Sequence, residues 1–146
     1  MINLFTIGFT KKSAEQFFNL LTENGVTRIV DTRLNHSSQL SGFAKSNDLK
    51  FFCKRIAGID YIHIPEFAPT AEILDQYRKK LISWEEYEKE YTNLLVSRDI
   101  INLYDYRDFH NNCILCSEDT PDKCHRRLLA EYLQKIYEDI RAVHLV

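Results

Sequence analysis

The chain has 146 residues, of which 45% are apolar and 27% are charged, and its formal net charge at pH 7 is −2. This length suffices for one well-buried core and is short for two. The net charge argues against a nucleic-acid-binding domain with a broad basic face, and no apolar run approaches the ~18 residues that a membrane span requires.

The start of the sequence, Met1-Ile2-Asn3-Leu4, leads directly into a strand pattern without a basic segment or a cleavage site, so we expect no signal peptide. In a chain without such a signal, the four cysteines are expected to be thiols rather than disulfides. These features together predict a cytoplasmic protein.

Strand and helix patterns alternate in the first 65 residues. Short apolar runs at 4–7, 26–31 and 59–64 predict three strands. The pair Ser13 and Gln16 has the spacing of a capping box and opens a helix before Gly25, while the apolar positions between 49 and 56 predict a second helix that Gly58 ends. This repeated order of strand, helix, glycine and strand is typical of a parallel sheet.

The second half begins with helices only. Thr70 and Ser83 are the expected N-caps of two helices, and a further turn or two is expected through Tyr106. The run 112–116 predicts a buried strand, Thr120 and Pro121 predict the N-cap and first residue of a helix to about residue 137, and 140–146 predict a last strand. We therefore predict an α/β fold, a single three-layer domain over residues 1–146, with a mostly parallel sheet of about five strands and helices on both faces.

Polar residues follow each predicted strand, and the carboxyl ends of parallel strands share one edge of the sheet, where ligands bind. The residues expected to converge at this edge are Thr10, Asp31, Arg33, His63, Cys116 and Glu118, joined by Cys124, His125 and Arg126 from the start of the last helix.

Proton transfer at this edge is assigned first to Glu118, because a carboxylate at the mouth of a site can act as a base. His63 or His125 would share that role, and Asp31 would orient its neighbours. For His63 a packed core imidazole is the alternative interpretation, and for Asp31 it is a structural ion pair.

Anion binding is assigned to Arg33 and Arg126, whose guanidinium groups offer planar donor forks, with Thr10 as a further ligand contact. A structural ion pair is the alternative role for Arg33. The expected ligand is a small anionic or nucleotide-like molecule. Nucleic acid is a partner that the net charge does not favour, no membrane partner is expected, and the sequence leaves the oligomeric state open.

The cysteines suggest two further kinds of chemistry. Cys116, at a strand end facing a helix N-terminus, is a candidate nucleophile, although its spacing to Arg126 is longer than in rhodanese-like and phosphatase-like loops, and simple packing is the alternative. Cys113, Cys116, Cys124 and His125 also suggest metal ligands. Strand positions three apart face opposite sides, and adjacent helical residues point about 100° apart, so we predict no metal site and no required cofactor.

The motifs of this chain resemble a family known as domain of unknown function 488, nearly from end to end. They are Thr6-Ile7-Gly8-Phe9-Thr10, Val30-Asp31-Thr32-Arg33, Tyr61-Ile62-His63-Ile64-Pro65, and Cys116-Ser117-Glu118 followed by Pro121 and Cys124-His125-Arg126. Departures occur at Asn35-His36, where the family has a proline, and at Phe67-Ala68, where it has Leu-Gly. The resemblance implies a compact α/β domain with its polar signature residues at one site, and it implies no reaction.

The sequence thus favours a small enzyme with hydrolase- or transferase-like acid/base chemistry on an anionic, nucleotide-like or nucleic-acid-derived ligand. Two alternatives stay open. One is a non-catalytic nucleotide-binding module, and the other is thiol chemistry at Cys116 or Cys124.

Overall fold

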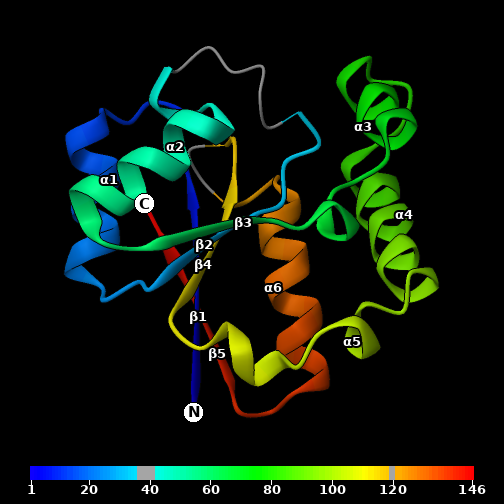
Figure 1. The fold of residues 1–146 in the computed structure, drawn as a ribbon. Coiled ribbons are helices and arrows are strands. Elements are labelled where there is room, and N and C mark those ends of the chain that lie inside the picture. Colours follow the sequence, from blue (N-terminus) through cyan, green and yellow to red (C-terminus); the bar gives the residue numbers. More distant parts are fainter. Residues whose placement is uncertain (36–41, 119–120) are drawn as a thin grey trace.

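A wholly parallel, five-stranded sheet runs through the centre of the protein in the computed structural model, which describes residues 1–35, 42–118 and 121–146 (Figure 1). The strand order is β3-β2-β4-β1-β5. The strands are β1 (Ile2–Gly8), β2 (Arg28–Asp31), β3 (Asp60–His63), β4 (Asn112–Cys116) and β5 (Ile140–Leu145). This confirms the predicted α/β fold, and the sheet is parallel throughout rather than mostly so.

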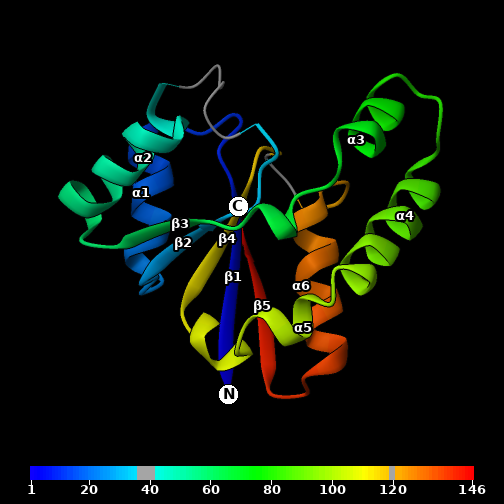
Figure 2. The same cartoon turned by 45° about the vertical axis from the view of Figure 1, so that its right-hand side comes forward.

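One face of the sheet is covered by α1 (Ala14–Glu23) and α2 (Ser46–Phe52), which a π-helical turn (Cys53–Ala57) extends (Figure 2). Phe17, Phe18 and Leu49 pack there against the strand residues Ile7 and Ile29. Because side chains alternate along a strand, only every second residue of each strand reaches this core.

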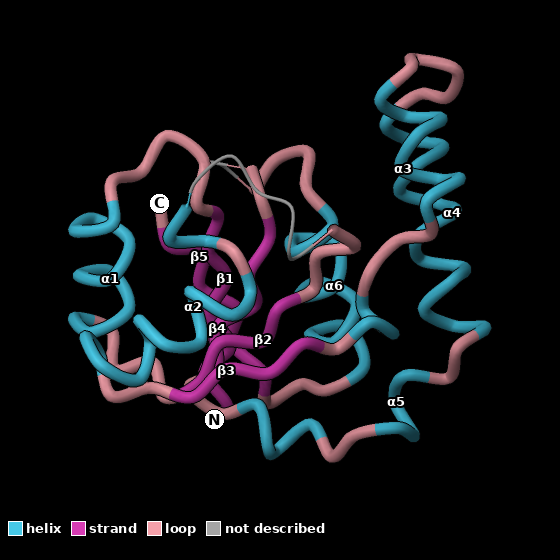
Figure 3. The backbone as a smooth tube through the Cα atoms, turned by 45° about the horizontal axis from the view of Figure 1, so that its top comes forward, coloured by secondary structure: helices cyan, strands magenta, loops and turns pink. Residues whose placement is uncertain are grey.

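The other face is covered by α4 (Trp84–Ser97) and α6 (His125–Ile136), which contact each other. Tyr91, Leu95 and Leu129 form a second core there with Val30 and Ile114. The helix α3 (Ala71–Arg78) pairs with α4, and α5 (Ile100–Leu103) leads back toward β4 (Figure 3). Among the described residues, no helix combines the length and apolar character that crossing a membrane demands.

The predicted helix ends are confirmed at several positions. Ser13 with Gln16 and Ser83 with Glu86 both form complete capping boxes, and the Thr70 side chain accepts a hydrogen bond from a backbone N–H of α3. Gly25 and Gly58 follow their helices with positive φ, at 69° and 65°. These signals are reliable because they act locally. The capping side chains satisfy backbone N–H groups at the start of their own helix, and the glycines adopt a positive φ without strain.

The predicted start of the last helix is wrong. Thr120 lies outside the described residues, Pro121 to Cys124 form turns, and α6 begins only at His125 with Cys124 as its N-cap. The proline at 121 therefore precedes the helix rather than opening it. This displacement changes the backbone at Cys124, and through it the geometry of the site.

The connections that leave β2 and β4 run to opposite faces of the sheet. The chain passes from β2 to α2 on one face, and from β4 to α6 on the other, although β2 and β4 are hydrogen-bonded neighbours (Figure 1). Such a point leaves a crevice beyond the carboxyl ends of the two strands, where ligands bind in open α/β sheets.

Candidate functional site

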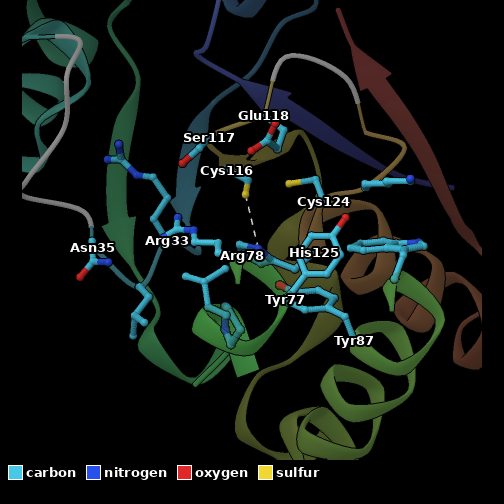
Figure 4. A pocket seen from close by; sticks show the side chains of 15 residues that line it. Arg33, Asn35, Tyr77, Arg78, Tyr87, Cys116, Ser117, Glu118, Cys124 and His125 are labelled. Carbon is cyan, nitrogen blue, oxygen red and sulfur yellow. Dashed lines mark hydrogen bonds between the residues drawn. The ribbon is translucent and has the colours of Figure 1, made fainter. Parts of the chain in front are cut away.

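A cavity of about 250 Å³ lies at this crevice (Figure 4). Its base contains Cys116 and Glu118 from the end of β4, together with Cys124 and His125 from the start of α6. Arg33 from the segment after β2 borders it on one side, and α3 and α4 enclose the rest. The cavity is on the face covered by α4 and α6. Residues two apart on a strand face the same side, and Ile114, two residues before Cys116, packs in the core on that face.

His125 connects the end of β4 to the end of β2. Its Nδ1 lies 3.4 Å from the Sγ of Cys116, and its Nε2 lies 2.8 Å from the backbone carbonyl oxygen of Thr32. A carbonyl oxygen only accepts hydrogen bonds, so Nε2 carries the proton and the lone pair of the neutral ring is on Nδ1, which faces the sulfur. Tyr91 packs edge-on against the ring, with the centroids 5.5 Å apart.

Cys124 brings a second sulfur to the same place. Its backbone is extended (φ −139°, ψ 140°) because it is the N-cap of α6. The two sulfur atoms and a ring nitrogen of His125 all lie within 4.8 Å of one another, and all three residues are buried. The expectation that Cys124 and His125 diverge like neighbours on a helix is therefore wrong, because Cys124 is not helical.

The two thiols of this cluster differ in acidity. Burial raises the pKa of Cys116, but the hydrogen bond from Cys124, the Arg126 cation and the backbone N–H groups of the next two residues outweigh it and leave the pKa below its usual value. Burial holds the pKa of Cys124 well above its usual value, and the hydrogen bond to Cys116 and the charge on Cys116 act in the same direction. Cys116 is therefore the more acidic thiol of the pair.

Cys113, three residues before Cys116, belongs to the opposite face of the sheet. It packs in the core under α1 and α2, and burial raises its pKa. The prediction that the two strand thiols face opposite sides is confirmed. Cys53 also lies in that core, and its pKa is raised to about 12 by burial. All four cysteines are free thiols.

Arg126 supports the loop after β4 from below rather than lining the cavity. It is fully buried, and its Nη1 donates a hydrogen bond to the backbone carbonyl oxygen of Glu118. Thr10 also contributes through the backbone, since its N–H donates to the carbonyl oxygen of Ser117 at 3.0 Å. Both residues thus hold the 117–118 segment in place, and neither borders the cavity.

Asp31 and His63 lie toward the other face of the sheet, do not line the cavity, and are connected to it through Arg33. Asp31 binds Arg33 through both carboxylate oxygens, at 2.9 and 2.8 Å, and also accepts a hydrogen bond from the Tyr61 hydroxyl. His63 Nε2 lies 3.0 Å from the Arg33 carbonyl oxygen. The structure therefore brings Glu118, His125 and the thiols together, and it places Asp31 and His63 away from them.

The walls of the cavity contain residues that the sequence did not mark as functional. Tyr77, Trp84 and Tyr87 form an aromatic wall in which the Trp84 and Tyr87 rings stack, with centroids 5.0 Å apart. Arg78 and Lys123 supply cations, and neither takes part in an ion pair within the described part of the chain. Helical spacing places such aromatic residues on one face but does not say which cavity they border.

Comparison with known proteins identifies one family. The family model described as domain of unknown function DUF488 matches residues 13–133, which include β2, β3, β4 and most of α6. No curated protein and no solved structure is significantly similar to the chain. The match spans the site and most of the sequence, so the chain belongs to the family of the domain of unknown function DUF488.

Proposed function

We propose that this protein is an enzyme that binds a small, anionic, nucleotide-like ligand in the cavity at the carboxyl edge of the sheet. The observation that carries the proposal is the composition of the cavity, which combines an aromatic wall, two exposed cations and a carboxylate around a buried Cys-His cluster. Concave sites that combine aromatic side chains with a few convergent polar groups are the usual sites of small-molecule ligands.

The aromatic wall favours a flat ring in the ligand. Tyr77 and Trp84 are half-buried and pack against each other, with their ring centroids 5.4 Å apart. This contact orders both rings in the absence of a ligand. A nucleobase stacked on such a ring gains about 1–3 kcal/mol.

The charges favour an anion. The Arg33 charge is largely offset by the buried Asp31 carboxylate, so Arg78 and Lys123 are the cations that the cavity offers to a phosphate. The volume of about 250 Å³ is somewhat below the ~300–1,000 Å³ of drug-sized sites and suits a mononucleotide-like molecule better than a nucleic acid strand.

Glu118 is the proposed proton-transfer group, because it is an exposed carboxylate that borders the cavity next to Cys116 (Figure 4). Its backbone carbonyl oxygen accepts a hydrogen bond from Arg126, which helps to position the residue at the cavity. Proton transfer by a positioned carboxylate contributes about 10²–10⁴-fold in rate.

The proposal is tested with a panel of nucleoside mono-, di- and triphosphates, using thermal shift for binding and mass spectrometry of the products for turnover. We expect at least one member to raise the Tm and to be converted. Arg78→Ala and Lys123→Ala should each weaken its Kd by about fivefold, whereas Lys79→Ala, which removes an exposed charge that does not line the cavity, should not.

Glu118→Gln should lower turnover by about 10²–10⁴-fold with a nearly unchanged Kd, while Glu90→Gln on the exposed side of α4 should leave both unchanged. A panel in which no member binds would overturn the proposal. Binding without turnover in the unaltered protein would replace the enzyme with a nucleotide-binding module.

A further inference from the structure

We infer that Cys116, Cys124 and His125 form a metal site of the zinc type, with the fourth coordination position open to the ligand cavity. The metal site stands on the geometry of the three side chains, whereas its part in a reaction rests on the proposed function. All three residues border the cavity, so an ion held by them would face the bound ligand (Figure 4).

The three ligand atoms are spaced as tetrahedral zinc requires. Zn–S distances of ~2.3 Å and Zn–N distances of ~2.0–2.1 Å place neighbouring sulfur and nitrogen ligands about 3.6 Å apart and two sulfur ligands about 3.8 Å apart. The Cys116 sulfur and the His125 Nδ1 are 3.4 Å apart, and no pair in the cluster exceeds 4.8 Å. Small rotations of the side chains therefore complete the site.

The surroundings of His125 are those of a metal ligand. Its Nε2–H is directed at the Thr32 carbonyl oxygen at 2.8 Å, and the Thr32 hydroxyl lies 3.1 Å from the same nitrogen. Metal-bound histidines almost always donate their other N–H group to a carboxylate, a carbonyl or water, which holds the ring and its tautomer. Here this hydrogen bond leaves the Nδ1 lone pair directed toward the two sulfur atoms.

The donor set selects among metal ions. Two thiolates and an imidazole suit zinc, whereas magnesium and calcium prefer oxygen ligands. Two thiolates also balance the charge of a divalent cation, so the loaded site is neutral in a buried position. Three protein ligands with one open position are the arrangement of catalytic zinc rather than structural zinc, which takes four.

With a metal ion at this site, Glu118 would act together with the ion. In hydrolysis, a water oxygen forms a bond to the electrophilic atom of the ligand while the bond to the leaving group breaks. Glu118 accepts the proton from the water and returns it to the leaving group. The ion would supply Lewis-acid polarisation at its open position. Zinc held by His and Cys ligands, with a glutamate outside the coordination sphere as acid and base, performs hydrolytic chemistry on nucleobases in deaminases.

The closing experiment measures metal on the full-length protein, purified without chelators from zinc-supplemented medium. We expect about one zinc per chain by elemental analysis. Replacement by cobalt should give the intense visible absorption of tetrahedral Co²⁺ with a thiolate charge-transfer band, and X-ray absorption should show two sulfur ligands. These readouts need no substitution, so they stand even if a variant fails to fold.

Variants then assign the ligands. Cys116→Ser, Cys124→Ser and His125→Gln should each lose the cobalt spectrum, while Cys53→Ser and Cys113→Ser, buried thiols outside the cluster, should keep it. An unaltered chain that takes up no metal, or a Cys116→Ser variant that keeps the full spectrum, overturns the site. Alkylation of Cys116 in a metal-free, active protein also overturns it, in favour of thiol chemistry. The nucleotide panel has its own readout, so a failure of the metal site and a failure of ligand binding are separable.

Discussion

The Cα atom of Gly8 lies against the backbone carbonyl of Glu118, so that a Cβ atom on residue 8 would overlap that oxygen. Gly8 ends β1 and is paired in register with Cys116 at the end of β4. The same Cβ would also come within 2.7 Å of the Arg126 guanidinium, which holds this loop. The absence of a side chain at position 8 is therefore what lets the loop after β4 pass over the end of β1.

Gly8→Ala should displace the 117–118 segment and with it the site. We expect a loss of about 1–3 kcal/mol or more in the free energy of unfolding, as for other overpacked positions, together with loss of metal and nucleotide binding. Gly25→Ala is the control. The substitution should cost about 1–2 kcal/mol because residue 25 has a φ of 69°, but the added Cβ would contact no neighbouring atom. Urea denaturation and cobalt titration of both variants check this. Equal metal binding by the two variants would contradict it.

Asp31→Asn should strongly destabilise the protein, because it leaves the buried Arg33 guanidinium facing a neutral group. Removing one partner of a buried ion pair costs about 3–5 kcal/mol. The chain offers a matched control in Asp105 and Arg107, which have the same sequence spacing and the same two hydrogen bonds but are exposed. Asp105→Asn should leave the urea midpoint nearly unchanged. Similar effects of the two substitutions would show that burial is not the deciding factor.

Tyr91→Phe removes a hydroxyl that donates to the Phe67 carbonyl oxygen at 2.7 Å in the core between α4 and the sheet. The carbonyl is then left without this donor, and we expect a loss of about 1 kcal/mol in the free energy of unfolding. Tyr106→Phe, whose exposed hydroxyl lies 3.3 Å from Asp139, should have no measurable effect. Thermal and urea unfolding of both variants measure this difference. An unchanged free energy of unfolding for Tyr91→Phe would mean that another donor replaces the hydroxyl.

His144 makes stability depend on pH. Burial lowers its pKa below the usual value of 6.5, and the Arg126 and Arg127 cations act in the same direction against Glu131. The folded protein therefore binds this proton less readily than the unfolded chain, so the free energy of unfolding should decrease as the pH falls below about 6.5. His144→Gln should flatten this decrease between about pH 7 and about pH 5.5 in urea denaturation. Parallel curves for the two proteins would exclude the contribution of His144.

Much of the fold was predictable because the signals that encode it are local. The capping boxes of Ser13 and Ser83 satisfy backbone donors within four residues, and Gly25 and Gly58 adopt a conformation that other residues resist. The apolar run at 113–116 underlies the predicted strand 112–116, which matches β4, since a strand buried on both faces is mostly apolar. The family follows from sequence as well, because its motifs occur in order along the chain.

The arrangement of the site depended on tertiary structure. The sequence by itself determined that polar residues follow each strand, but alternation across the sheet sends Asp31 and His63 to one face and Cys116 to the other. The late start of α6 leaves Cys124 extended, and this backbone directs its sulfur to Cys116 and His125. Such convergence is a property of long-range packing, because residues 93 positions apart, such as Thr32 and His125, meet only when the sheet has formed.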